Sequence, residues 1–163
     1  MHGDGLAALA ADGSTVKTLK YTARPATAVT ALTRIFGSAP VHKKTGKSVY
    51  SGGADIYRWK GFEMRVEKSG TKLEPRIGVF MTRATVNGVA LHSVDGVRVG
   101  GSAADAFAAH PGTVADDAQA FTVDSVEVGT SADGVLTHSV RVIGSSKTGK
   151  ITTLLAPARN FGA

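Results

Sequence analysis

Apolar side chains recur every three or four positions between Pro25 and Gly37, which is the period of one face of an α-helix. The residues of this stripe are Val29, Leu32, Ile35 and Phe36. Pro25 suits the first helical position because its ring fixes a helical φ, and Gly37 suits the position after the last turn. The pattern therefore predicts an amphipathic helix that buries the stripe against another element.

A different period marks the middle of the chain, where apolar and charged residues alternate. Residues 57–60 and 62–67 each follow this alternation. A period of two is typical of β-strands with one buried face, and Gly61 between the two runs indicates a bulge or a tight turn. Further apolar runs predict strands at residues 77–86, 121–128, 136–143 and 151–155.

The order of elements in the first half of the chain recurs in the second half. Residues 6–21 and 89–99 each predict a β-hairpin, because apolar residues flank an Asp-Gly pair that favours a tight turn. The two pairs are Asp12-Gly13 and Asp95-Gly96. The recurrence indicates a duplicated unit.

A second, shorter helix is predicted after the second hairpin. Ser102 suits its N-cap position because a hydroxyl accepts a hydrogen bond from a free backbone N–H, and Phe107 is the large residue of its apolar face. We therefore expect an α+β fold of two pseudo-repeated units, residues 1–86 and 87–163, each a helix packed on antiparallel strands. The two units form either two small domains or one continuous domain. Phe107 should be buried, like the apolar stripe of the first helix.

Composition narrows the classes of function. The chain has 163 residues, 42% of them apolar, and it carries a formal net charge of +6. This charge favours anionic partners such as nucleic acid, wall polymers or acidic proteins, although a solvated basic surface is the alternative. The absence of cysteine excludes disulfides, thiolate metal sites and cysteine nucleophiles, and it favours the cytosol without excluding export. No apolar run approaches the roughly 20 residues that span a bilayer.

Motifs that resemble catalytic elements lack the context that the chemistry needs. Residues 144–150 nearly match a phosphate-binding loop, but Ile151 replaces the hydroxyl residue, so a hairpin turn is expected. None of the five histidines pairs at metal-ligand spacing. His110 should cap the carbonyl end of the second helix, and His138 should be a partly buried strand residue. We therefore expect no enzyme activity, no cofactor and no metal.

One region combines aromatic and basic residues, which are enriched at protein interfaces. The residues of this candidate binding surface are Lys43, Lys44, Lys47, Tyr57, Arg58 and Trp59. Tyr57 and Trp59 would supply contact area as anchors, and the cations would form a charged rim beside an exposed loop at residues 41–54. The alternative is that Trp59 and Phe62 belong to the core and that the loop is merely solvated.

Three stretches carry a resemblance to a known group of proteins. They are residues 28–40, residues 57–62 and residues 97–105 with His110-Pro111-Gly112. They resemble segments of actinobacterial secreted proteins and lipoproteins of unknown function, whose tandem units are similar to those of β-lactamase inhibitor proteins and small outer-membrane assembly lipoproteins. The resemblance implies helices packed on antiparallel sheets, a secreted or envelope location and a binding role.

Two functions follow from these observations. The first is a non-enzymatic, exported or cell-envelope binding module for a protein or an anionic wall polymer. The alternative is an intracellular basic domain that binds nucleic acid or a protein, which the net charge and the absence of cysteine favour. A leader peptide at the start of the native gene would distinguish export from a cytoplasmic location.

Overall fold

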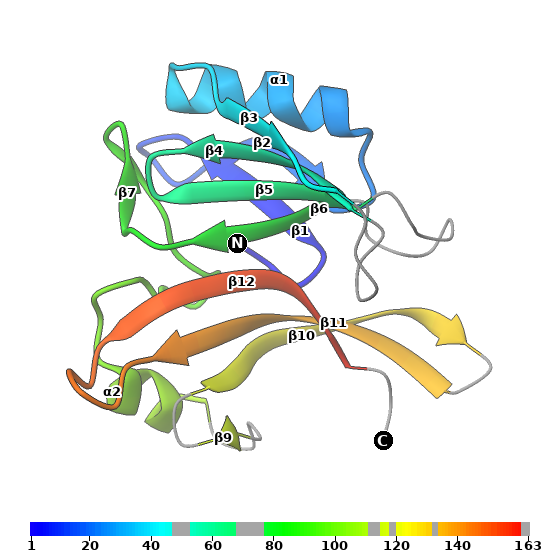
Figure 1. The fold of residues 1–163 in the computed structure, drawn as a ribbon. Helices are drawn as coiled ribbons and strands as arrows, with labels where there is room; N and C mark the ends of the chain where they lie inside the picture. The colour runs from blue at the N-terminus through cyan, green and yellow to red at the C-terminus, as the bar shows by residue number, and fades with distance from the viewer. Residues whose placement is uncertain (47–52, 68–76, 111–114, 118–119, 132–133, 161–163) are drawn as a thin grey trace.

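Antiparallel β-strands make up most of the protein (Figure 1). The structure is a computed structural model that describes residues 1–163 except 47–52, 68–76, 111–114, 118–119, 132–133 and 161–163. Eight strands of the described part of the chain form one antiparallel sheet. In spatial order they are β3 (Val41–Lys44), β4 (Ala54–Trp59), β5 (Phe62–Glu67), β6 (Ile77–Met81), β12 (Ile151–Asn160), β11 (Gly134–Gly144), β10 (Ala120–Ser131) and β9 (Ala115–Asp117).

Strand register gives this sheet one continuous apolar face. A row of cross-strand partners crosses β4, β5, β6, β12, β11 and β10, and all of its members are buried. The row consists of Trp59, Phe62, Met81, Leu154, Val142 and Phe121. Since side chains alternate between faces, residues two positions away extend the same surface. The pairing of β6 with β12 joins strands from both halves of the chain into one core.

Helix α1 (Pro25–Phe36) lies over the first half of this face (Figure 1). Pro25 begins the helix and Gly37 ends it in a left-handed conformation with φ of 66°, as the sequence predicts. The ring of Phe36 lies 5.5 Å from that of Trp59 and 5.1 Å from that of Phe62. Leu32 is buried too, whereas Val29 and Ile35 are partly buried against the core, so the predicted burial of the helix stripe is confirmed for two of its four residues.

The predicted first hairpin is confirmed and covers the same face beside α1. Its strands are β1 (Gly5–Leu9) and β2 (Thr15–Lys20), and residues at its base reach the core. The backbone carbonyl of Tyr21 accepts a hydrogen bond from Ile77 N at 3.1 Å, and its hydroxyl donates to His2 O at 3.1 Å. Burial raises the pKa of the Tyr21 phenol well above 10. The base of the hairpin is therefore fixed to the body of the protein.

The α+β fold of two repeated units is wrong, because the protein is mostly β-structure and its second half does not repeat the first. Residues 93–97 form a turn in which Ser93 N donates to Val97 O, rather than a hairpin. Two short strands, β7 (Thr85–Val86) and β8 (Val89–Ala90), precede this turn. Strands of both predicted units join one sheet, and the boundary at residue 86 itself stays a prediction.

Helix α2 (Ala103–Ala108) is too small to serve as the covering layer of a second unit. Ser102 caps it as predicted, with Asp105 N donating to Ser102 Oγ at 3.2 Å. However, its six residues are mainly alanine, none is buried, and Phe107 is 43% exposed. The prediction that Phe107 is buried is wrong, because a six-residue alanine-rich helix offers little apolar area. The long strands β10, β11 and β12 build the second half instead.

Candidate functional site

An apolar groove lies between the β1–β2 hairpin, the second half of α1 and residues 88–94. Its volume is about 720 Å³, which is within the range of sites that hold ligands or anchor residues. Most of its lining is aliphatic, and the larger lining side chains are Leu6, Leu9, Val16, Leu19, Leu32, Ile35, Val89, Leu91 and Val94. The groove floor reaches Phe36, Phe62 and Met81, which belong to the core.

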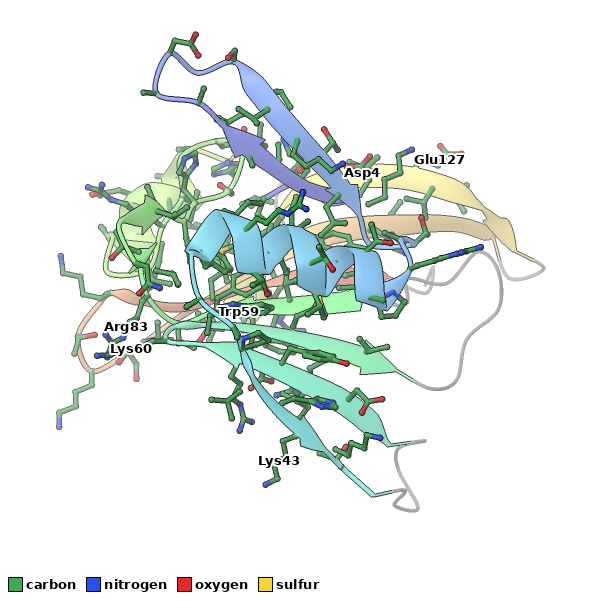
Figure 2. All side chains as sticks on the ribbon, turned by 90° about the horizontal axis from the view of Figure 1, so that it is seen from above. Asp4, Lys43, Trp59, Lys60, Arg83 and Glu127 are labelled. Carbon is green, nitrogen blue, oxygen red and sulfur yellow. The ribbon has the colours of Figure 1, made fainter. Side chains whose placement is uncertain are left out.

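The hairpin forms the first wall, and its outer half stands away from the body (Figure 2). Gly13 has a φ of 83°, and Ser14 N donates to Asp12 Oδ1 at 2.9 Å, so the predicted Asp-Gly turn is confirmed. Leu9 is 51% exposed and Val16 is 68% exposed. A two-stranded ribbon is only marginally stable alone, so this outer half has apolar surface that its own chain does not cover.

The opposite wall begins at the turn between β7 and β8. Asn87 and Gly88 both have positive φ, 47° and 83°, as in the two-residue turns that match strand twist. Asn87 Nδ2 donates to Phe36 O at 2.8 Å, which fixes this wall to the end of α1. The turn that follows holds Val94 at the groove with 47% of its surface exposed.

Polar groups in the opposite wall already form hydrogen bonds within the chain. Ser93 is buried, and its hydroxyl accepts a hydrogen bond from Val97 N at 3.0 Å. His92 Nδ1 lies 2.6 Å from Ser93 O, and Val94 N donates to Met1 O at 2.9 Å. The groove therefore offers contact area more than hydrogen bonds. Such a lining suits an apolar occupant, because a polar one would lose its hydrogen bonds to water without replacement.

The surface predicted from the sequence is divided between two faces of the sheet. Trp59 is 4% exposed, and its Nε1 donates to Ser38 O at 2.9 Å, so it lies in the core beneath α1 (Figure 2). It cannot anchor a partner, and the alternative of a core tryptophan is correct. Register places Tyr57 on the same face as Trp59, while Arg58 and Lys43 point to the opposite face.

The remaining residues of the predicted surface lie along the edge of the sheet. Residues 41–44 form strand β3 rather than a loop, and both Lys43 and Lys44 are exposed there. Tyr57 is half-buried and stacks on His42, with ring centroids 4.4 Å apart and an interplanar angle of 5°. Lys47 lies outside the described residues. The structure thus brings Lys43 near Arg58 but separates both from the aromatic rings.

Arg58 takes part in an ion cluster on the face of the sheet opposite Trp59. Its Nε donates to Glu63 Oε2 at 2.6 Å, and Arg65 Nε donates to Glu63 Oε1 at 2.5 Å. Arg65 also lies 4.2 Å from the centre of the Phe80 ring. Burial alone would raise the pKa of Glu63, but the two arginines lower it overall. The carboxylate of Glu63 neutralises part of the positive charge of the two arginines, so this cluster is a weaker site for an anion.

The other motifs have structural roles. Residues 144–150 connect β11 to β12 as a turn, as expected. His110 Nδ1 lies 2.7 Å from Ala106 O in the last turn of α2, and His138 is buried in β11, so both predictions are confirmed. Among the residues that the structure describes, no three His, Cys, Asp or Glu side chains gather as metal ligands. Neither described helix is long and apolar enough to cross a membrane.

Sequence reasoning missed the residues that border the groove, Leu9, Val16 and Val94. Strand alternation does not predict the face of Val16, because Val16 is the extra residue of a β-bulge where Ala8 pairs with Lys17 and Leu9 with Thr15. Comparison with family models, curated proteins and solved structures found no match to this chain. The site therefore has to be interpreted from its own geometry.

Proposed function

We propose that the protein is a non-enzymatic binding module that holds an apolar segment of a partner protein in the groove between the β1–β2 hairpin and α1. One observation carries the proposal. Six large hydrophobic side chains are exposed in the described part of the chain, and three of them, Leu9, Val16 and Val94, border this groove. Clustered exposed apolar surface is typical of an interaction site, whereas scattered apolar residues are ordinary.

The shape of the groove favours a protein segment as the occupant. One wall is a two-stranded ribbon with small alanine side chains at residues 7, 8, 10 and 11, which allow a second backbone to approach closely. Strand edges in such ribbons can pair with an added strand, and pockets for alternate side chains then supply specificity. The aliphatic lining would receive those side chains. A partner would also cover the outer half of the hairpin.

Site-directed photo-cross-linking in cells of the native organism tests this function. A photoreactive amino acid replaces Val16 in one variant and Val41 in the control, since both are strand valines with 68% and 70% exposure. We expect a covalent adduct with a protein from position 16 and none from position 41. Adding Val94→Asp to the position-16 variant should remove the adduct, because the charge enters the opposite wall of the groove.

Three outcomes would contradict the proposal. They are equal adducts from both positions, an adduct with a lipid or small molecule instead of a protein, and an adduct that persists in the Val94→Asp background. A purified protein that turns over a substrate at the groove would contradict its non-enzymatic nature.

We propose further that the module works outside the cytoplasm, at the cell envelope or beyond it. The sequence resemblance to secreted proteins and lipoproteins supports this location. Fractionation of native cells with an antibody against the protein tests it, and recovery from the envelope or the medium is expected. Recovery from the cytoplasm alone would favour the alternative, an intracellular domain that binds nucleic acid or a protein.

A further inference from the structure

Exposed cations gather at the end of the main sheet where four chain segments meet. The residues of this basic end are Lys60, Arg83, Arg98, Lys147 and Lys150. Lys60 lies in the turn from β4 to β5, and Arg83 follows β6. Figure 2 shows both side chains at the same end of the molecule, away from Lys43.

Backbone contacts bring the first two of these cations side by side. Thr82 N donates to Gly61 O at 2.9 Å, so the chain after β6 runs along the β4–β5 turn. The stem of Arg83 packs over Gly61, where a methyl group would lie 2.7 Å from Arg83 Cβ and Cγ. Gly61 has a φ of 97°, which also favours glycine. Lys60 and Arg83 therefore share one surface.

The other three cations are tied to the start of β12, which lies next to the end of β6. Register pairs Met81 with Leu154, so the residues before Leu154 run beside the end of β6. Gly100 N donates to Ile151 O at 2.8 Å and Ile151 N donates to Gly101 O at 2.9 Å, which holds the segment of Arg98 against that of Lys150. Lys147 lies in the same β11–β12 turn as Lys150.

These five charges have no described acidic partner. All are exposed, and none takes part in an ion pair with another residue that the structure describes. Asp105 on the adjoining α2 is exposed and is paired with none of them. Unpaired cations repel one another, so the basic end has an unfavourable self-energy that a polyanion would relieve. This contrasts with Arg58 and Arg65, which share Glu63.

We propose that the basic end binds a linear polymer of phosphate groups, through charge and independently of the apolar groove. The cations come from four separate segments and are exposed, so they form an extended surface rather than an enclosed site for one anion. Lysine and arginine both bind phosphate, arginine with two parallel hydrogen bonds. The nearby aromatic rings of Trp59 and Phe62 are buried, so the described part of this end offers no stacking platform for nucleic-acid bases.

Binding to inorganic polyphosphate tests the proposal in the purified protein. The test variant is Lys60→Ala/Arg83→Ala/Lys150→Ala, and the matched control is Lys20→Ala/Lys43→Ala/Lys44→Ala, which removes the same charge from exposed positions elsewhere. Affinity is measured by fluorescence anisotropy over a range of salt concentrations, with circular dichroism to confirm that both variants fold. Inorganic phosphate, polyglutamate and a single-stranded oligonucleotide serve as comparison ligands.

We expect the wild type and the control to bind polyphosphate with a strong salt dependence and the test variant to bind at least about tenfold more weakly. The slope of log affinity against log salt concentration should be smaller by about 2 in the test variant, because each cation–phosphate contact contributes roughly 0.7 and the variant lacks three of the cations. Inorganic phosphate and polyglutamate should bind weakly. Equal weakening in both variants would overturn the proposal, as would absence of polyphosphate binding at low salt. Tighter binding of the oligonucleotide or of polyglutamate would also overturn it, in favour of that polymer.

Discussion

Replacing Trp59 by alanine should destabilise the protein strongly, because this side chain lies at the centre of the first half of the core. Its ring is tilted against Phe36 at 5.5 Å and meets Phe62 edge-on at 5.9 Å. Its Nε1 donates to Ser38 O at 2.9 Å, which ties the segment after α1 to β4. Loss of the ring therefore removes packing and leaves a carbonyl without its partner.

The magnitude follows from these contacts. Truncation of a buried tryptophan to alanine costs about 3–5 kcal/mol of unfolding free energy. Trp59→Phe keeps most of the ring contact but removes the hydrogen bond to Ser38 O, which should cost about 0.5–1.5 kcal/mol because Ser38 is exposed and water can replace the donor. The order of stability should thus be wild type, then Trp59→Phe, then Trp59→Ala, with the second step at least as large as the first.

Two measurements check this prediction. Urea unfolding followed by circular dichroism gives the free energies, since the substitutions remove the only tryptophan of the chain. In the wild type, Trp59 fluorescence should be blue-shifted and poorly quenched by acrylamide, because the ring is 4% exposed. A loss below about 1 kcal/mol for Trp59→Ala, or quenching as fast as in a free peptide, would refute the assignment of Trp59 to the core.

Two further predictions concern charge and the two helices. The pKa of Glu63 is lower in the folded protein than in the unfolded chain. Its ion pairs with Arg58 and Arg65 therefore stabilise the fold fully at a pH above the ordinary carboxyl pKa. This stabilisation is lost as the pH falls through the lowered pKa of the folded state. Glu63→Gln should cost about 1 kcal/mol at neutral pH and less in acid, and a pH-independent cost in urea unfolding would contradict this. Leu32→Ala should cost about 2–5 kcal/mol and Phe107→Ala less than half as much, as thermal unfolding would measure; equal costs would contradict the difference in burial.

Local signals in the sequence predict the first half of the fold well. Pro25, Gly37 and the apolar stripe define α1, and the Asp12-Gly13 pair defines the first hairpin, because these features act within a few residues. The alternation on either side of Gly61 predicts β4 and β5 for the same reason. Each of these predictions depends on a local backbone conformation that the residues at that position favour by themselves.

The second half was harder to predict, because its structure depends on contacts between distant residues. The Asp95-Gly96 pair has the same turn chemistry as the first hairpin, yet Ser93 closes this turn without strands on either side. The long strands β10, β11 and β12 pair with their neighbours in sequence, and the pairing of β12 with β6, across about half the chain, joins them to the first half. Similar local residues therefore adopt different structures, and the expected repeat did not form.

The candidate site was predicted less well than the fold. Aromatic and basic residues near position 57 are adjacent in sequence, but the period of two places Lys43 and Arg58 on the face opposite Tyr57 and Trp59. The groove joins residues 9 and 16 of the first hairpin with residue 94, which is distant in the chain, and none of the three belongs to a distinctive motif. Only the packing of the hairpin against α1 brings their exposed apolar surfaces together.

The affinity of the cross-linked partner protein for two matched variants tests the central claim most directly. Val16→Asp places a charge in the groove, and Val41→Asp places the same charge at an equally exposed strand position outside it. Burial of a valine contributes about 1.5 kcal/mol or more, so calorimetric titration should give at least a tenfold weaker Kd for Val16→Asp. Val41→Asp should bind like the wild type. Equal affinities for the two variants would contradict a partner-binding role for the groove.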